Sequence, residues 1–318
     1  MKKIKILSNQ KGGTHFALVI IVVSLLIATV GYAYTQTSEA KKLGKKPSLG
    51  IAEGAIAGKK LANKKQAKKV KFSAATYNVL SQRWDDKDKF RERWESTNIF
   101  FPGRKIEVLG VIGKATPDII GIQEAINWNP DTNQKTRQAG DIASYMRSIG
   151  YSTHATQKGN ADPIYWKTSV FTYGGWEGQR LIVDKSSGLQ PRYLNMVRLR
   201  HTKTGKTVLV ANYHFSQFYL GKGKNYINNQ LDGIAESITI AKLRYPKDKV
   251  IFTGDFNGYG DDVIRRLNDH NISINTSTPR ARSIDHVMVE SGVGKRGFKT
   301  IPNKNASDHN LVISRLAL

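Results

Sequence analysis

The chain has 318 residues, enough for one large domain with appendages or for two average domains. Hydrophobic residues make up 39% of it, so a sizeable core can be buried and wholesale disorder is excluded. The sequence contains no cysteine, which excludes disulfides, cysteine–zinc sites and thiol catalysis. A net charge of +25 is explained either by a polyanionic partner, nucleic acid first and anionic lipid or wall polymer second, or by solubility alone.

The chain begins with a basic segment, residues 1–15, followed by an uncharged apolar stretch, residues 16–34. At about 1.5 Å per residue, a helix over that stretch spans about 28 Å, close to the ~30 Å hydrocarbon core of a bilayer. We expect a single membrane-spanning helix there, either a retained anchor or a cleaved signal. The small-x-small sequence at residues 31–33 is a mediocre cleavage site, which favours the anchor. The lysines of residues 1–15 predict a cell-membrane protein whose domain lies outside the cytoplasm, and cleavage would make it secreted.

Residues 35–71 form a linker rich in lysine, glycine and alanine. The first 71 residues hold fifteen lysines against Glu39 and Glu53, a net +13 that leaves +12 of the total +25 to the remainder. Repulsion between the lysines favours an extended segment. A solvated spacer is the simpler interpretation, and the alternative is that the linker holds a polyanionic substrate near the membrane.

From residue 72 onward, short apolar runs alternate with longer stretches of helical spacing. The runs predict strands at Phe72–Leu80, Ile119–Gln123, Ile164–Phe171, Tyr193–Arg200, Val208–His214, Val250–Gly254, Ser283–Val289 and Leu311–Leu316. Apolar residues at helical spacing predict helices around Ile106–Ile112, Ile142–Ile149, Leu231–Ala241 and Val263–Leu267. A turn-like stretch at Arg200–Thr207 predicts a hairpin between two strands. This mixture predicts an α/β domain with mixed sheets.

Polar residues follow these strands at their carboxyl ends, where α/β proteins collect catalytic groups. They are Asn78, Glu124, His214, Asp255 with Asn257, Asp285 with His286, and Ser307-Asp308-His309. Each one alone has an ordinary explanation as a turn residue, a solvated carboxylate or a structural histidine. The six positions together, in this order, are not explained by such ordinary roles.

In this order and spacing the motifs resemble the endonuclease/exonuclease/phosphatase superfamily, which includes pancreatic-type deoxyribonucleases, abasic-site nucleases, sphingomyelinases and inositol-polyphosphate phosphatases. The most specific pieces are Thr253–Asn257, Ser283–His286 and Ser307–His309, supported by Gln123-Glu124 and Tyr77-Asn78. The resemblance covers residues 72–318. It implies a four-layer α-β-β-α sandwich of two mixed sheets, with the site at one edge.

The resemblance also implies a metal site. Glu124 is expected to be the principal ligand, with Asn78 and with Asp308 across the site. Hard oxygen ligands select Mg²⁺ or Mn²⁺ and leave room for water and phosphate. We therefore expect a divalent-metal cofactor.

Five residues are implied in catalysis. Asp255 and Asn257 are expected to orient or deprotonate the attacking water. His309 is expected to contact the scissile phosphate and transfer protons, with Asp285 on its other ring nitrogen. His214 matches a second acid/base histidine of the deoxyribonuclease and sphingomyelinase branches, where the deoxyribonucleases orient it with a carboxylate. Asp162, just before Pro163–Trp166, is the nearest candidate for that carboxylate.

The +12 balance of residues 72–318 favours nucleic acid as the substrate, DNA in preference, because phosphate neutralisation supplies most non-specific affinity. The candidate phosphate contacts are Arg180, Arg192, Lys222 and Lys224. Three alternatives remain at this stage: a sphingomyelinase- or phospholipase C-like lipid phosphodiesterase, a phosphomonoesterase, and a non-catalytic surface protein that captures DNA. The sequence indicates no protein partner.

Overall fold

The computed structural model describes residues 69–81, 94, 103–126, 128–129, 134–135, 137–153, 162–183, 192–216, 223–278, 283–303 and 306–318. The basic segment 1–15, the expected membrane helix 16–34 and most of the linker 35–71 lie outside the described residues. Within the described part of the chain, every helix is too short or too polar to cross a bilayer.

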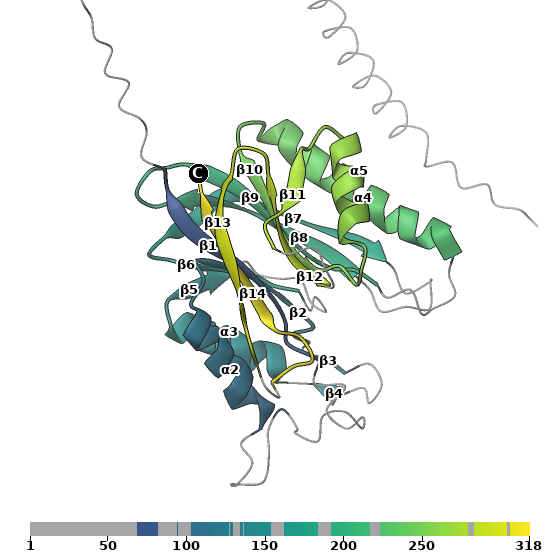
Figure 1. The fold of residues 1–318 in the computed structure, drawn as a ribbon. Coiled ribbons are helices and arrows are strands. Elements are labelled where there is room, and N and C mark those ends of the chain that lie inside the picture. Colours follow the sequence, from purple (N-terminus) through teal and green to yellow (C-terminus); the bar gives the residue numbers. More distant parts are fainter. Residues whose placement is uncertain are drawn as a thin grey trace, which may run out of the picture. The chain divides into compact units, whose positions relative to one another are not determined.

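The first of two large sheets has six strands. They are β1 (Lys71–Asn78), β2 (Ile119–Gln123), β5 (Tyr151–Thr153), β6 (Ile164–Lys167), β13 (Gly294–Ile301) and β14 (Leu311–Ala317). Their order across the sheet is β13-β14-β1-β2-β6-β5 (Figure 1). Strands β1 and β2 run parallel, whereas the other pairs are antiparallel, so the sheet is mixed as the sequence predicts.

The second sheet also has six strands. They are β7 (Phe171–Val183), β8 (Arg192–His201), β9 (Thr207–His214), β10 (Lys249–Asp255), β11 (Ile274–Thr276) and β12 (Asp285–Glu290). Their order is β11-β12-β10-β9-β8-β7, and β9 and β10 are its parallel pair. The hairpin expected around Arg200–Thr207 joins β8 to β9. A separate two-stranded ribbon pairs β3 (Trp128–Asn129) with β4 (Gln134–Lys135).

Helices cover the outer face of each sheet, which gives four layers (Figure 1). The helices are α2 (Arg104–Ala115), α3 (Gln138–Ser148), α4 (Gly223–Arg244) and α5 (Gly260–Asp269). The first sheet packs on α2 and α3 through a core that includes Ile120 and Ile142. The second packs on α4 and α5 through a core that includes Phe252. A third core between the sheets includes Phe72 and Phe171, whose rings meet edge to face, and burial of these three cores is the main stabilising term of the domain.

One of the predicted boundaries was wrong. The predicted strand Ile164–Phe171 is broken, because β6 ends at Lys167 and a turn over residues 168–170 leads into β7 at Phe171. The sequence pattern also missed β7 and β13. Both are edge strands, and the side chains of β13 are almost all exposed. Strand β13 has no buried face and so leaves no alternating apolar pattern, and its charges oppose edge-to-edge association. Strand β7 packs Trp176 and Ile182 against the core of the second sheet, but glycines interrupt its apolar pattern.

The faces that the two sheets turn toward each other change from apolar to polar along the strands. Successive inward positions of β9 read Val208, Val210, Asn212 and His214, and β1, β10 and β12 show the same trend toward Asn78, Asp255 and Asp285. The pleat has a period of two, so each of these polar side chains necessarily points between the sheets. In the strand register Asp255 lies opposite both His214 and Asp285. The fold therefore gathers one polar end of the inter-sheet layer into a single place.

Candidate active site

Two turns at the carboxyl ends of strands adopt a left-handed backbone conformation. Glu124 follows β2 with φ 64°, and Asn257 follows β10 with φ 48°. The Asn257 turn is closed by its own N–H, which donates to Asp255 Oδ1 at 3.0 Å, and by its Nδ2, which donates to Phe215 O at 2.7 Å. Asparagine tolerates this conformation, whereas a glutamate with positive φ is uncommon and is held by its surroundings. The N–H of Glu124 donates to Asp162 Oδ1 at 3.3 Å.

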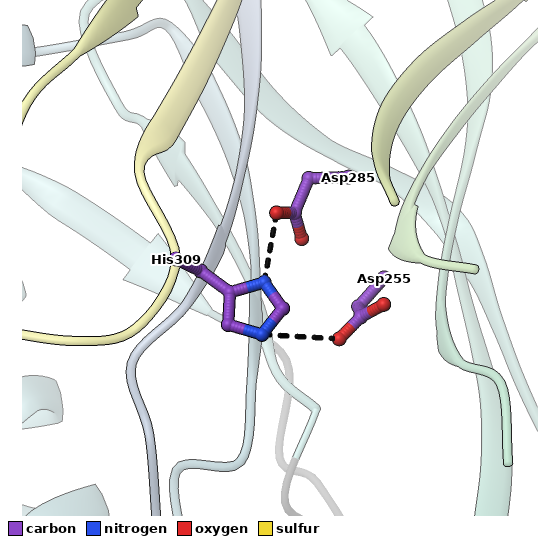
Figure 2. Close-up of side chains that lie close together, drawn as sticks. All are labelled: Asp255, Asp285 and His309. Carbon is purple, nitrogen blue, oxygen red and sulfur yellow. Dashed lines mark hydrogen bonds and ion pairs between the residues drawn. The ribbon is translucent and has the colours of Figure 1, made fainter. Parts of the chain in front are cut away.

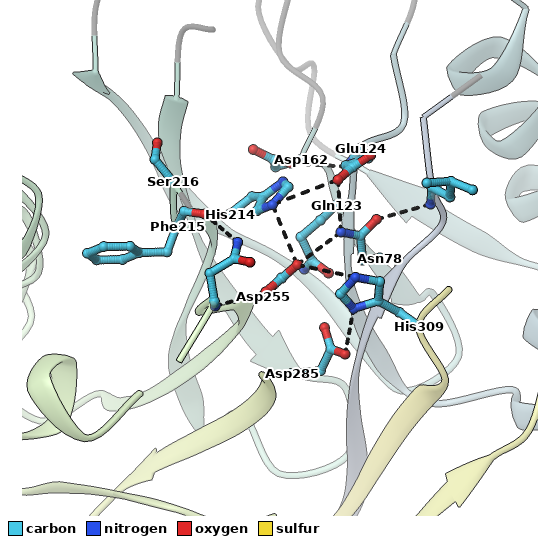
Figure 3. Close-up of polar contacts among 12 residues, drawn as sticks. Asn78, Gln123, Glu124, Asp162, His214, Phe215, Ser216, Asp255, Asp285 and His309 are labelled. Carbon is cyan, nitrogen blue, oxygen red and sulfur yellow. Dashed lines mark hydrogen bonds and ion pairs between the residues drawn. The ribbon is translucent and has the colours of Figure 1, made fainter. Parts of the chain in front are cut away.

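Asn78 joins the carboxylates of the two sheets. Its Nδ2 donates to Glu124 Oε1 at 3.1 Å and to Asp255 Oδ2 at 3.0 Å (Figure 3). Its Oδ1 accepts the Leu80 N–H at 3.0 Å, which fixes the orientation of the amide. An amide nitrogen cannot bind a cation, so the side of Asn78 that faces the carboxylates acts as a donor.

Glu124 lies at the centre of the expected metal site. Its Oε2 accepts the Ser81 N–H at 2.8 Å, and its Oε1 accepts the Asn78 amide. Asp308 is more open, with 49% of its side chain exposed, and its Oδ1 lies 3.8 Å from His309 Nε2. Glu124 and Asn78 are thus in direct contact, while Asp308 joins the group through His309.

Asp255, Asp285 and His309 form the most compact group of the site (Figure 2). His309 Nδ1 lies 2.8 Å from Asp285 Oδ2, and His309 Nε2 lies 3.7 Å from Asp255 Oδ2. Burial opposes the imidazolium, but the hydrogen bond and charge of Asp285, together with the charges of Asp255 and Asp308, outweigh it and raise the pKa of His309 to about 10. A protonated histidine offers no lone pair to a metal. In its protonated form His309 is therefore not a metal ligand, and the carboxylate oxygens remain as the candidate ligands.

The carboxyl of Asp255 is buried and faces other acids. Burial, with the negative charge of Asp285 next, raises the pKa of Asp255 to about 7, against the opposing effects of His309 and of the hydrogen bonds from Asn78 and Asn257. A carboxyl group with a near-neutral pKa is suited to accept a proton at physiological pH.

His214 has a partner that differs from the expected one. Its Nδ1 lies 2.7 Å from Nη1 of Arg192, where the family resemblance implies a carboxylate. Burial, and then the charges of Arg192 and His309, hold the pKa of His214 well below its usual value. Asp162 is also buried, and burial raises its pKa to about 7, yet its Oδ1 holds the backbone of Glu124 and not the histidine ring.

The other sequence-predicted cations are not placed in this network. Arg180 donates to Gly233 O and Ser237 Oγ of α4 and pairs with Glu236 at 2.9 Å, so its described contacts fasten β7 to that helix. Lys222 lies outside the described residues, and Lys224 belongs to α4 with a side chain that is likewise outside them.

A buried polar ladder beneath the site was not predicted. Gln123 Nε2 donates to Asn212 Oδ1 at 2.7 Å, Thr253 Oγ1 donates to the same oxygen, and Asn212 Nδ2 donates to Ile122 O. Ser307 adds a further link, because its hydroxyl donates to the carbonyl of Asn78 and accepts the His309 N–H. The signal available in the sequence was an uncharged polar residue at an inward position of an apolar strand.

The oxygen atoms of the site fit a hard divalent cation. Asp255, Asp285 and Asp308 lie around one protonated histidine, and Glu124 contacts Asn78 and His214 beside them, an excess of acidic groups that a cation would offset. Moreover, Asp285 Oδ1 is buried and has no hydrogen-bond partner within the described part of the chain. Buried carboxylate oxygens without a partner are unfavourable, which indicates a further group in this cluster.

Comparison with known proteins agrees with this architecture. The model of the Endonuclease/Exonuclease/phosphatase family matches residues 75–309. Among solved structures, the 2′,3′-cyclic phosphatase ANGEL2 in complex with adenosine-2′,3′-vanadate has a TM-score of 0.62 at 15% identity, covering 79% of this chain and 96% of that one. The mannosyl-6-phosphatase of Bacteroides thetaiotaomicron gives 0.56 at 16% identity, covering 78% and 100%.

The TDP2 protein of D. rerio, solved with a single-stranded DNA product, gives a TM-score of 0.54 at 15% identity, covering 77% of this chain and 98% of that one. No curated protein sequence matches the chain. At these identities the solved structures show a shared fold.

Proposed function

The chain belongs to the endonuclease/exonuclease/phosphatase family, whose members hydrolyse phosphoester bonds, and from that premise we propose that it is a divalent-metal-dependent phosphodiesterase that cleaves nucleic acid, DNA in preference. One observation carries the proposal. Asn78, Glu124, His214, Asp255, Asp285 and His309 come from both sheets and meet in one contact network. A protein that only captured DNA would have no use for a buried set of this kind.

The metal would be held chiefly by Glu124, with Asp308 beside it, because these carboxylates combine access to solvent with negative charge. Asn78 would position Glu124 through its amide nitrogen. When bound, Mg²⁺ or Mn²⁺ supplies Lewis-acid stabilisation of the phosphoryl oxygens.

The side chains supply the remaining chemistry. Asp255 is placed to orient a water molecule and accept its proton, with its Oδ1 fixed by the Asn257 N–H. His309, kept protonated by Asp285, is placed to contact a phosphoryl oxygen and to provide a proton to the leaving oxygen. Water attack and departure of the leaving group are thereby assigned to separate residues.

The preference for DNA is supported by charge. Residues 72–318 carry +12 of the total +25, and a phosphate backbone is the polyanion to which a basic domain binds with most counterion release. The fold also accommodates a DNA strand in one similar structure, that of D. rerio TDP2. Residues 16–34 are proposed to tether the enzyme to the membrane with its domain outside the cytoplasm, or to direct its secretion.

The test is a substrate panel. Full-length protein is incubated with plasmid DNA, single-stranded RNA, sphingomyelin vesicles and mannose 6-phosphate, each with and without Mg²⁺. We expect Mg²⁺-dependent cleavage, fastest on DNA. Faster turnover of sphingomyelin or of the phosphomonoester would overturn the substrate assignment, and binding of DNA without any cleavage would support the capture function.

A further inference from the structure

His214 makes a contact that determines which ring nitrogen carries its proton. Its Nδ1 lies 2.7 Å from Arg192 Nη1. A guanidinium has hydrogen-bond donors only, so Nδ1 must be the acceptor in this bond. A neutral imidazole carries one proton, and in this arrangement the proton is on Nε2.

The Nε2 atom faces the reacting groups. It lies 3.5 Å from Asp255 Oδ2 and 3.8 Å from Glu124 Oε1, with 3% of the His214 side chain exposed (Figure 3). The N–H therefore points toward the carboxylates of the site, beside which the proposed function requires a phosphate to bind. A second proton could enter the ring only if Nδ1 gave up its bond to Arg192.

We propose that Arg192 is a positioning residue that holds His214 as a neutral imidazole with its proton on Nε2, so that His214 is a fixed hydrogen-bond donor to a phosphoryl oxygen and not a proton-transfer group. This inference rests on the proposed function and narrows the part that His214 plays in it. It replaces the sequence-based expectation of a second acid/base histidine.

The two histidines of the site are consequently distinguished by the partner on Nδ1. His309 has the carboxylate of Asp285 there, which requires a proton on that nitrogen, whereas His214 has a guanidinium, which forbids one. Both Nε2 atoms face the same oxygen, Asp255 Oδ2, at 3.7 and 3.5 Å. One histidine is thus built to carry charge and the other to remain a neutral donor.

Asp162 explains how an arginine is kept in this half-buried position. Its carboxyl is buried, and the two groups attract each other electrostatically. Asp162, which the sequence suggested as the partner of His214, therefore interacts electrostatically with Arg192. The expected pair of an acid and a histidine is thus replaced by three residues, Asp162, Arg192 and His214.

The tautomer can be measured without any assay of activity. Full-length protein labelled with ¹⁵N is studied by long-range ¹H–¹⁵N correlation at neutral pH, with the His214 signals assigned from the His214→Gln variant. We expect the Nε2–H pattern in wild type and its loss in Arg192→Met. Arg200→Met, an exposed position on the same strand, is the matched control and should leave the pattern unchanged. A wild-type His214 with its proton on Nδ1, or on both nitrogens, overturns the proposal.

Three substitutions then separate a donor from an acid/base group. The amide nitrogen of Gln can reach the position of Nε2 and that of Asn the position of Nδ1, while Ala supplies neither. On DNA with Mg²⁺, we expect His214→Gln to keep at least about a tenth of the wild-type rate, and the other two to lose on the order of 10²-fold, typical of one lost transition-state donor. Equal losses in all three, with folding confirmed by thermal unfolding, contradict the donor role. If wild type cleaves no phosphodiester, the proposed function fails, and the tautomer measurement still decides the role of Arg192.

Discussion

Two clusters of charged side chains lie at opposite ends of the paired strands β10 and β12, and they are built on different principles. At one end Glu290 accepts from Lys242 at 3.0 Å and Lys249 at 3.2 Å, and nearby Asp248 accepts from Arg198 at 2.6 Å. Every acid there has its own cation. At the other end, Asp255, Asp285 and Asp308 share one protonated histidine, and Asp285 leaves an oxygen without a partner among the described residues.

The difference between the two clusters distinguishes a structural role from a functional one. In a matched cluster each charge that leaves water meets an opposite charge, so removal of one partner leaves the other uncompensated and destabilises the fold. Unmatched carboxylates raise the free energy of the folded state and remain only where they serve another purpose. Loss of a charge in the site should therefore lower activity with little effect on folding stability. Loss of a charge in the Glu290 cluster should lower folding stability with little effect on activity.

The largest effect is expected from substitutions in the unmatched cluster. Asp255→Asn and His309→Ala should each lower the rate of phosphodiester hydrolysis by on the order of 10²–10⁴-fold, because both groups act mainly in the transition state. Asp255→Asn should leave the thermal midpoint equal or higher, since it removes repulsion from Asp285. Turnover and thermal unfolding are measured on the same samples. A variant that keeps more than about a tenth of the wild-type rate would mean that the residue has been assigned the wrong role.

The matched cluster should respond in the opposite way. Glu290→Gln should lower the free energy of unfolding by about 2 kcal/mol, less than the loss of a fully buried pair because Lys249 is 38% exposed. Turnover should stay within about twofold, since additivity holds for distant sites. Asp262→Asn, which breaks an exposed pair with Arg265 on α5, is the control and should cost no more than about 0.5 kcal/mol in urea unfolding. A turnover defect in Glu290→Gln as large as that of Asp255→Asn would remove the distinction between the clusters.

The charge state of His309 gives a pH-dependent test. Its folded pKa of about 10 lies above its unfolded value, so its contribution to stability is complete below pH ~6.5 and is lost as pH rises toward 10. Asp285→Asn removes the main partner of the imidazolium and should lower the pKa of His309, which flattens the stability profile over that window. Histidine NMR titration and urea unfolding at several pH values measure both effects. An unchanged pKa in the variant would show that Asp285 does not hold the charge.

The smallest effect concerns the amino-terminal lysines, which precede all of the site residues in the sequence. Removing residues 1–65 should leave turnover on short oligonucleotides near the wild-type value, because none of the family motifs lies in that segment. If the linker lysines contact DNA, affinity for long DNA should depend less steeply on salt after truncation, since fewer counterions are released. Binding of both proteins is compared across a salt series. Equal slopes would leave the linker as a spacer.

The sequence predicted most of the strands that carry a buried apolar run and most of the motifs that follow one another in the family's order. Strand β2 and the carboxyl ends of β1, β9 and β10 were predicted from apolar runs that end in Asn78, His214 and Asp255, and the structure brings those ends together. Edge strand β13 was missed because an exposed strand carries no alternating pattern, and β7 was missed because glycines interrupt its apolar positions.

Side-chain orientation was also beyond the sequence. The order of motifs indicated which residues meet, but not that Asn78 presents its nitrogen, nor that Arg192 takes the position of a carboxylate behind His214. Strand β8 contributes Arg192 from a position that follows no motif. Such pairings depend on three-dimensional packing between strands far apart in the chain.

The central claim is that excess carboxylate serves to hold a metal, and a metal add-back experiment tests it most directly. Plasmid cleavage by full-length wild type and by Glu124→Gln is followed after EDTA treatment and during titration with Mg²⁺ or Mn²⁺. We expect no cleavage by wild type in EDTA, full recovery on adding either ion, and a variant that needs far more metal or stays inactive at saturation. Cleavage by wild type that continues unchanged in EDTA would contradict the account.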